Sequence, residues 1–212
     1  MFDVTLTFDN GPEPEVTPRV LETLRRTGVS ATFFVIGQKL VAHRALAERA
    51  AAEGHWIGNH TFTHSIPLGE RVEADAPEME IGRTQAIIGD LAGAERLFRP
   101  NGGGGKLGPH LLSPAAADYL KHGGFTCVLW NCVPEDWLDP EGWADRALQD
   151  CRSRDWTLLV VHDLPTGAMA HLDRFIHGVR DAGGRFRQDF PPDCLPLRGG
   201  RETESLGSFV AS

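Results

Sequence analysis

The sequence contains no run of about 20 apolar residues, the length that a helix needs to cross a bilayer. Positive charge is also scarce, because 21 Lys and Arg face 29 Asp and Glu and the formal net charge is −8. Nucleic acids and anionic membranes bind basic faces, so neither is an expected partner. Small or neutral substrates fit this composition better.

Cysteine is scarce as well, and its spacing carries no motif. Cys127, Cys132, Cys151 and Cys194 form no paired C-x-x-C pattern, which argues against a zinc knuckle and favours free thiols over disulfides. The first predicted strand begins at Phe2, which leaves no room for a signal peptide. We therefore expect a cytoplasmic protein.

No linker and no fixed-period repeat interrupts the chain. Its 212 residues, 41% of them hydrophobic, can bury one sizeable core, so we expect a single domain over residues 1–212. The patterns predict helices over 16–26, 42–53, 79–91, 114–122, 140–152 and 168–182, and strands near 2–8, 31–36, 56–59, 97–99, 126–130 and 157–161. This alternation is typical of a parallel α/β barrel. The proline-rich tail after Phe190 is expected to be extended and partly disordered.

The first cluster of reactive groups follows the first predicted strand. Residues 2–8 alternate Val, Thr and aromatic side chains, and the Asn-Gly-Pro that follows ends the strand pattern. Asp9 and Asn10 therefore lie at the carboxyl end of a strand, where the active sites of repeated strand–helix folds gather. The same residues are also common in ordinary tight turns, and this stretch alone leaves that alternative open.

The second cluster is a histidine pair, His60 and His64, after the predicted strand 56–59. Histidines four residues apart lie on one face of a helical turn and could bind one divalent cation. Sites of this kind use two imidazoles and one oxygen ligand, with an open position for water. An accidental pair is the alternative in a chain with 9 histidines.

Three further clusters also follow predicted strands. Arg99 precedes a run of four glycines that begins at Gly102, and it could orient a carboxylate while the glycine N–H groups face an oxyanion. A surface arginine on a flexible loop explains that segment equally well.

His162 ends an apolar strand and is a general acid or base candidate. Asp136 could pair with His162 and raise the pKa of its imidazole. Trp137 is either a core residue or one wall of a sugar-binding cleft.

Together, these five clusters resemble those of the polysaccharide deacetylases of carbohydrate esterase family 4, the NodB homology domain. The matching segments are residues 7–12, 60–64, 99–100, 136–137 and 159–163. The resemblance implies a distorted, incomplete (β/α) barrel and a metal-dependent hydrolase that removes acetyl groups from N-acetylated sugars. It also implies Asp9 as catalytic base, His162 as catalytic acid, Arg99 and Asp136 as their respective partners, and a divalent metal, commonly zinc, bound by His60, His64 and the residue at position 10.

The chain departs from the family at several of these positions. Asn10 stands where a metal-binding aspartate is usual, so we expect weaker metal binding by an amide oxygen that brings no charge. Gly102 lies where the family has a tyrosine, so an aromatic wall is expected to be lost while the backbone N–H remains available to polarise the carbonyl. Val133 replaces a common aspartate, and Val160 a leucine that often lines the acetyl pocket. We expect a more open cleft and an altered substrate.

Three hypotheses follow from these observations. The first is a metal-dependent N-deacetylase that acts on a sugar or a related amide. The second is a metal-poor hydrolase of a non-sugar C–N bond, and the third is a non-catalytic carbohydrate-binding relative. The joint presence of Asp9, Arg99 and His162 argues against the third. Deacetylases of cell-wall glycan usually act outside the membrane, so the expected cytoplasmic location favours a soluble oligosaccharide or small amide.

Overall fold

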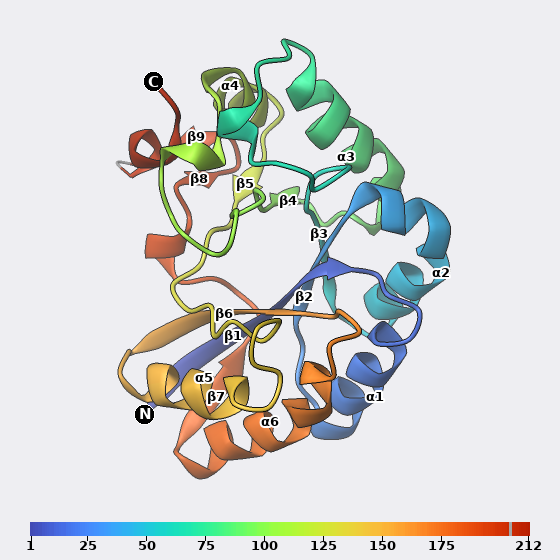
Figure 1. Cartoon of the computed structure of the whole chain (residues 1–212), viewed down its shortest axis with the longest axis vertical. Coiled ribbons are helices and arrows are strands. Elements are labelled where there is room, and N and C mark those ends of the chain that lie inside the picture. The colour runs from blue at the N-terminus through green and yellow to red at the C-terminus, as the bar shows by residue number, and fades with distance from the viewer. Residues whose placement is uncertain (204) are drawn as a thin grey trace.

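The chain forms a curled, mostly parallel sheet with helices along its outer side, as a computed structural model describes for residues 1–203 and 205–212 (Figure 1). The strands lie in the order β6-β1-β2-β3-β4-β5-β8-β9, with β7 beside the first half of β1. One bridge, between Cys132 and Leu159, connects the segment after β5 back to β6. The distorted, incomplete (β/α) barrel predicted from the sequence is confirmed.

The strands deliver their carboxyl ends to one edge of the sheet, because those from β1 to β6 pair in parallel. Their bounds are β1 (Phe2–Gly11), β2 (Thr32–Val35), β3 (Trp56–Asn59), β4 (Leu97–Phe98), β5 (Thr126–Cys127), β6 (Trp156–His162), β7 (Gly184–Arg187), β8 (Leu197–Arg198) and β9 (Arg201–Glu202). Strand β7 was not predicted.

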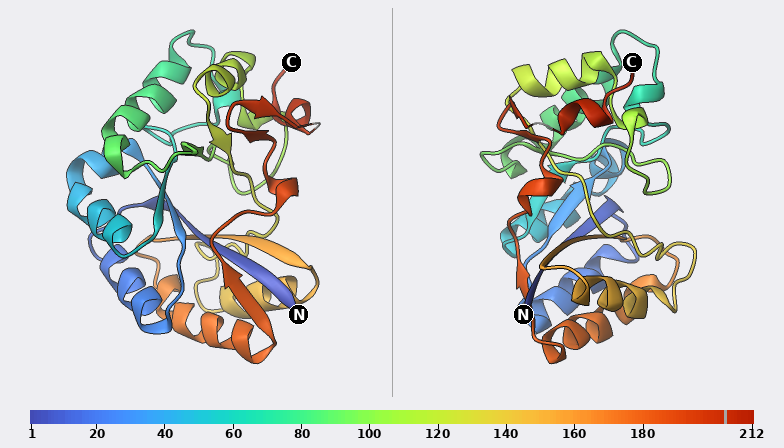
Figure 2. Two further views of the ribbon diagram at one scale, coloured as in Figure 1. Left: turned by 180° about the vertical axis from the view of Figure 1, so that it is seen from behind. Right: turned by 90° about the vertical axis from the view of Figure 1, so that its left-hand side faces the viewer.

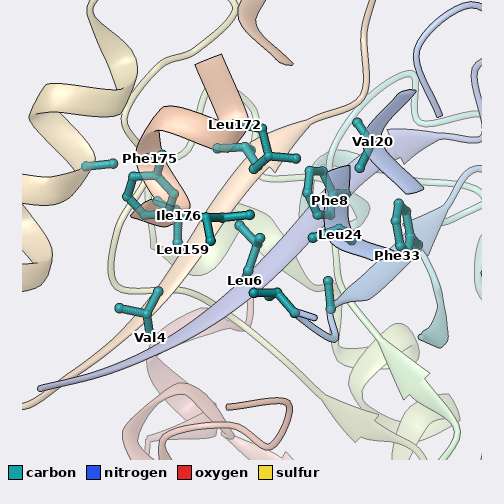
Figure 3. Close-up of a cluster of buried hydrophobic side chains, with 14 of the residues drawn as sticks. Val4, Leu6, Phe8, Val20, Leu24, Phe33, Leu159, Leu172, Phe175 and Ile176 are labelled. Atoms are coloured by element: carbon teal, nitrogen blue, oxygen red, sulfur yellow. The ribbon is translucent and has the colours of Figure 1, made fainter. Parts of the chain in front are cut away.

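Alternation along β1 separates a core face from a site face. Leu6 and Phe8 point to the helices and pack in a buried cluster with Phe175 of α6 (Figure 3). Successive side chains of a strand point to opposite faces, so Thr7 and Asp9 face the interior of the curled sheet. The β-branched and aromatic residues that favour the strand thus also set the direction of Asp9.

The helices are α1 (Thr17–Thr27), α2 (Gly37–Ala52), α3 (Arg83–Ile88), α4 (Pro114–His122), α5 (Trp143–Arg152) and α6 (Leu172–Asp181). Local signals explain several of their ends. A proline lies in the first turn of α1, and Gly28 ends the helix with φ 64°. The Ser113 hydroxyl caps α4 by accepting the N–H of Ala116 at 3.1 Å.

Two predicted helices differ from the structure. Helix α2 begins at Gly37, where the N–H groups of Gly37 and Gln38 donate to the carbonyls of Thr61 and Phe62, and it is kinked at His43, so the helix predicted from residue 42 corresponds to its second part. The predicted helix 79–91 is divided into a π turn (Glu78–Gly82), α3 and a short 3₁₀ turn. The start of α2 thus depends on contacts with residues 61 and 62, which hydrophobic periodicity does not predict.

The prediction of an extended, partly disordered tail is wrong. Strand β8 pairs antiparallel with β5 through Leu197 and Cys127, and β9 pairs with β8. Leu195, Leu197 and Leu206 are buried in a second core cluster, and the tail lies beside β5 and α4 (Figure 2). Pro191 and Pro192 begin a short 3₁₀ turn, while the leucines that follow supply the burial that orders the segment.

Within the described part of the chain, no helix is both long and apolar enough to span a bilayer.

All four cysteines are buried free thiols. Burial raises the pKa of each thiol, which makes them poor nucleophiles.

Candidate active site

A pocket of about 280 Å³ lies at the carboxyl ends of β1, β3 and β6, beside the glycine-rich loop. Most of the residues predicted for the site line it: Asp9, Asn10, His60, His64, Gly102, Trp137, Val160 and His162. Arg99 and Asp136 lie behind its wall, fully buried, and each contacts a lining residue. Segments far apart in the sequence therefore meet at one edge of the sheet.

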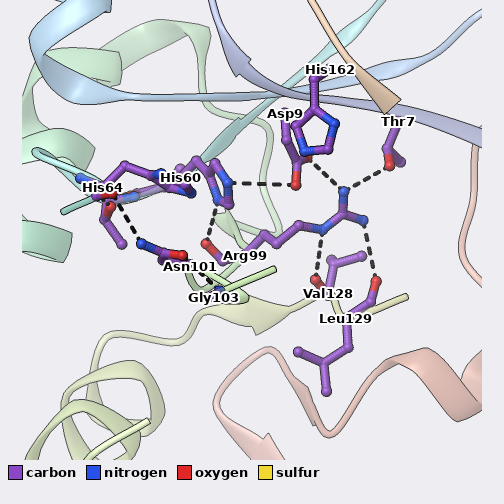
Figure 4. Close-up of polar contacts among 12 residues, drawn as sticks. Thr7, Asp9, His60, His64, Arg99, Asn101, Gly103, Val128, Leu129 and His162 are labelled. Atoms are coloured by element: carbon purple, nitrogen blue, oxygen red, sulfur yellow. Dashed lines mark hydrogen bonds and ion pairs between the residues drawn. The ribbon is translucent and has the colours of Figure 1, made fainter. Parts of the chain in front are cut away.

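Arg99 holds the carboxylate of Asp9 in one orientation. Its Nη1 donates to Asp9 Oδ1 at 2.8 Å and to the Thr7 hydroxyl at 2.7 Å, while Nε and Nη2 donate to the carbonyls of Val128 and Leu129 (Figure 4). Burial alone would raise the pKa of Asp9. The nearby charges, Arg99 first, outweigh burial and leave that pKa below its usual value. Asp9 is therefore ionised at neutral pH.

Asp136 holds His162 in a comparable way. Its Oδ1 lies 2.8 Å from His162 Nδ1 and its Oδ2 accepts the His162 backbone N–H at 3.0 Å. Burial would lower the pKa of His162, but the hydrogen bond and charge of Asp136 raise it above the usual value. Because Nδ1 is engaged, Nε2 is the nitrogen left for proton transfer. We call Asp9–Arg99 and His162–Asp136 the acid–base pairs.

Trp137 lines the pocket and is only partly buried, so it is not a core residue, while its contact with a sugar stays a prediction. Its ring meets the His162 ring edge to face, with centroids 4.9 Å apart and an interplanar angle of 87°. This contact limits the rotation of the imidazole and adds an apolar surface beside it.

The histidine pair is brought together, but the helical turn predicted for it is wrong. Residues 60–64 form an irregular segment after β3, in which Thr61 and His64 have φ of 66° and 54°. The rings of His60 and His64 nevertheless lie 4.5 Å apart. A backbone that turns back on itself replaces the spacing of a helix.

Both imidazoles are neutral in this setting. His60 Nδ1 lies 2.9 Å from the Arg99 carbonyl, which only accepts, so Nδ1 carries the proton and Nε2 has a free lone pair 3.5 Å from Asp9 Oδ2. Burial lowers the pKa of His60, and burial with the neighbouring His60 lowers the pKa of His64 to about 3. Neutral imidazoles are the form that binds metals.

Asn10 lies where the pairing of β1 with β2 is interrupted. The register shifts between Asp9 and Gly11, and Asn10 has φ 71°, a conformation that asparagine tolerates better than most residues. Strand β1 therefore continues to Gly11, beyond the predicted end at residue 8. Asn10 lines the pocket, and its buried Oδ1 has no hydrogen-bond partner among the residues described.

The donor set at this side of the pocket fits a divalent cation only with an amide oxygen. No cluster of three or more His, Cys, Asp or Glu side chains in residues 1–203 and 205–212 has the geometry to hold a metal. Two neutral imidazoles and Asn10 Oδ1, which no described residue engages in a hydrogen bond, form a nitrogen and oxygen set that suits zinc and similar ions. We call His60, His64 and Asn10 the candidate ligand triad.

The glycine-rich loop region and the segment after β5 contribute residues that the sequence argument missed. Asn101 Nδ2 donates to the His64 carbonyl at 3.0 Å, and its Oδ1 accepts the Gly103 N–H at 2.9 Å. Trp130 lines the pocket and donates from Nε1 to the Gly105 carbonyl at 2.9 Å. The apolar run that carries Trp130, before the Asp-Trp motif, was the available signal.

Trp130 corrects the expectation that this wall would lose its aromatic surface. A Cβ at Gly102 would lie 2.7 Å from the Trp130 ring, so the indole occupies the space beside the missing side chain. Val133 and Val160 both line the pocket, and the more open cleft and altered substrate expected from these positions stay predictions.

Asp163, next to His162, is buried without belonging to the acid–base pairs. It accepts a hydrogen bond from the Thr17 hydroxyl through Oδ2, whereas its Oδ1 has no partner in the described part of the chain. Burial raises its pKa to about 7. Any side chain at Gly11 would collide with this carboxyl group, which explains the glycine there.

Comparisons with known proteins agree with this arrangement. Residues 2–126 match the family model described as polysaccharide deacetylase. A peptidoglycan-N-acetylglucosamine deacetylase of Bacillus cereus is 30% identical over 191 residues, which cover 87% of this chain and 66% of that protein. A chitooligosaccharide deacetylase of Sinorhizobium fredii is 30% identical over 174 residues, 80% of this chain and 76% of its own length.

Solved structures give the same result. The chain superposes on a family 4 carbohydrate esterase from Streptomyces lividans in complex with acetate with a TM-score of 0.75 and 27% identity, covering 92% of this chain and 96% of that one. Several curated relatives are much longer, and the chain spans only 36% or 37% of their length.

Proposed function

The chain belongs to the polysaccharide deacetylase family, and from this premise we propose that it is a metal-dependent hydrolase that removes an N-acetyl or related acyl group from a sugar or oligosaccharide. Family membership confirms the resemblance predicted from the five motifs. One observation carries the proposal: the pocket places an ionised, arginine-held carboxylate and a carboxylate-held imidazole of raised pKa beside two neutral histidines.

The acid–base pairs supply both proton transfers of an amide hydrolysis. Asp9 removes a proton from the attacking water, whose oxygen forms the new bond to the acyl carbon. We propose the N–H of Gly102, a residue that lines the pocket, as the donor to the oxyanion. Protonated His162 then gives the Nε2 proton to the departing amine as the C–N bond breaks, and Asp136 stabilises the imidazolium until that point.

The candidate ligand triad would hold the metal. When bound, a divalent cation supplies Lewis-acid polarisation of the acyl carbonyl and of water. His60 is oriented for this role by the Arg99 carbonyl behind it, and such outer contacts fix the ring and its tautomer. Asn10 contributes an uncharged oxygen, so we expect weaker binding than an aspartate would give. Zinc fits this nitrogen and oxygen set.

The pocket supports a small, neutral substrate group. Ligand pockets commonly measure about 300–1,000 Å³. This one, at about 280 Å³, suits one acylated sugar unit at a time. Its described lining residues include no Lys or Arg that could bind an anionic substrate. A cytoplasmic location, which stays a prediction, would make a soluble oligosaccharide the substrate rather than cell-wall glycan.

Metal analysis with two variants at position 10 tests the proposal. Protein purified without chelator is analysed for divalent ions, and acetate release from N-acetylglucosamine oligomers is measured for the wild type, Asn10→Asp and Asn10→Gly. Aspartate restores a charge, whereas glycine removes the oxygen and still tolerates φ 71°. We expect metal affinity to fall in the order Asp, Asn, Gly, with steps of about tenfold or more.

Each alternative hypothesis has its own signature in this experiment. Amide hydrolysis by a wild type that holds no divalent ion, and that excess chelator leaves unchanged, would establish the metal-poor hydrolase instead. Binding of the oligomers without acetate release, in the wild type and in Asn10→Asp at saturating metal, would establish the non-catalytic relative.

A further inference from the structure

The segment that carries His60 and His64 has a backbone that its own residues do not favour. Thr61 and His64 both lie in the left-handed region, with φ of 66° and 54°. A β-branched residue such as threonine is rare there, because its Cβ substituents crowd the backbone. Such a conformation persists only where the surrounding contacts hold it. The contacts that hold this segment therefore decide where the two imidazoles lie.

Glu80 supplies a concentrated set of these contacts. Its Oε2 accepts the backbone N–H groups of Phe62 and Thr63, each at 2.8 Å. Its Oε1 accepts the Thr63 hydroxyl at 2.6 Å and Arg71 Nη2 at 2.7 Å. The residue is 4% exposed, so water does not compete strongly for these bonds. A single buried carboxylate thus accepts three hydrogen bonds from the segment between the two histidines.

The π turn explains how Glu80 reaches this position. Residues 78–82 form one widened helical turn before α3, and turns of this kind often mark functional sites. The same turn offers the Ile81 carbonyl, which accepts Asn59 Nδ2 at 2.9 Å, while Asn59 Oδ1 accepts the Thr61 N–H at 3.0 Å. The backbone and the Glu80 side chain of the π turn therefore both accept hydrogen bonds from the histidine segment and the residue before it.

We propose that Glu80 is a positioning residue for the metal ligands His60 and His64. The inference rests on the proposed function, because it takes these histidines to bind the metal. The geometry suits a carboxylate, because both oxygens of Glu80 accept two hydrogen bonds each from the four groups that meet them. A glutamine in its place would turn an NH₂ group toward one of the two donor pairs and break that half of the contact.

The test compares Glu80→Gln with Glu78→Gln in the full chain. Glu78 lies on the same π turn, but its carboxylate accepts the Tyr119 hydroxyl at 2.8 Å and is exposed, so it is a matched control. Metal-free protein is titrated with Co²⁺, and the affinity and visible absorption spectrum are recorded. We expect Glu80→Gln to bind Co²⁺ about 10- to 100-fold more weakly and with a changed spectrum. The control should stay within about twofold.

Amide hydrogen exchange of the metal-free proteins separates this inference from the proposed function. In Glu80→Gln the N–H groups of Phe62 and Thr63 should exchange at least about tenfold faster, because they lose a buried charged acceptor. Wild-type protein that binds no Co²⁺ would contradict the proposed function, whereas the exchange rates would still decide whether Glu80 holds the segment. Unchanged affinity, spectrum and exchange in Glu80→Gln would overturn the inference.

Thr63→Val keeps the test decisive should Glu80→Gln not fold. This nearly isosteric change removes the hydroxyl that donates to Glu80 Oε1 and leaves the carboxylate in place. We expect a smaller effect in the same direction, about three- to tenfold in Co²⁺ affinity, from the loss of one charge-assisted hydrogen bond. Wild-type affinity and exchange in Thr63→Val would contradict the proposal.

Discussion

The acid–base pairs and the candidate ligand triad share one pocket but are built differently. In the pairs, each reactive group meets a buried partner of opposite charge at 2.8 Å, Arg99 for Asp9 and Asp136 for His162. In the triad, Asn10 Oδ1 has no hydrogen-bond partner among the described residues, although it is buried. Buried partners preorganise the proton-transfer groups, whereas none of the described residues engages Asn10 Oδ1, which is available to the cation that we propose.

Loss of the base tests the pairs most strongly. Asp9→Asn keeps the shape of the side chain but removes the charge that accepts a proton. We expect kcat/KM for acetate release to fall by about two to four orders of magnitude. Metal content, measured on the same protein, should change far less than in Asn10→Gly. Retained activity in Asp9→Asn would remove the base assignment.

Asp136, the partner of the proposed acid His162, should affect the pH dependence of the reaction. Because Asp136 raises the pKa of His162, and the reaction needs His162 protonated, activity should decline as pH rises through that pKa. Asp136→Asn lowers this pKa, so the alkaline limb of kcat/KM moves to lower pH, and the rate at the optimum falls by roughly 10²-fold as the imidazole loses its orientation. The measurement is a pH profile of kcat/KM for the wild type and Asp136→Asn. An alkaline limb at the same pH in both proteins would contradict the proposed pairing of Asp136 with His162.

Asn101 connects the triad to the glycine-rich loop, because it donates to the His64 carbonyl and accepts the Gly103 N–H. Asn101→Ala removes two hydrogen bonds, each contributing about 1 kcal/mol. We expect kcat/KM to fall roughly tenfold, with weaker metal binding as part of the loss. Titration of activity with added metal measures this, and wild-type behaviour would show that the glycine loop and the triad are independent.

Asp163 should affect stability rather than rate, although it adjoins His162. In the folded chain its pKa is about 7, against 3.8 for an ordinary aspartate, so the folded state keeps a proton that the unfolded state releases. Stability therefore falls as pH rises from about 4 to 7, and Asp163→Asn should reduce that fall by on the order of 1–3 kcal/mol.

Urea unfolding of both proteins at pH 4.5 and pH 7.5 measures this difference. Lys39 and His162 lower the pKa of Asp163 and are present in both proteins, so a difference in pH dependence between the two proteins comes from position 163. The same pH dependence in both proteins would contradict the assigned titration. A large loss of rate in Asp163→Asn would place Asp163 in the acid–base pairs.

Much of this molecule could be predicted from local patterns. Alternation along residues 2–8 set the direction of Asp9, and proline and glycine marked both ends of α1. The five motifs were sufficient for the family and the fold, because strand ends of a parallel sheet meet at one edge whatever the helices between them do. The clustering of Asp9, His60, Arg99 and His162 followed from that topology.

Other features could not be predicted, because their causes lie far away in the sequence. The left-handed backbone at Thr61 depends on contacts with the π turn, which hydrophobic periodicity does not reveal. The tail is ordered because Leu195 and Leu197 find a core formed by β5 and its neighbours. Trp130 enters the pocket because the segment after β5 bends back toward β6.

The sequence by itself determined which chemical groups this protein has and which strand ends carry them, since strand alternation and turn residues act over a few neighbours. It also determined that position 10 is an amide. Only the tertiary structure decided that the amide oxygen lies buried beside two neutral histidines, with no hydrogen-bond partner in the part of the chain that the structure describes. The physical reason is that burial, pKa shifts and the left-handed histidine segment depend on groups brought together from distant segments, which local propensity does not encode.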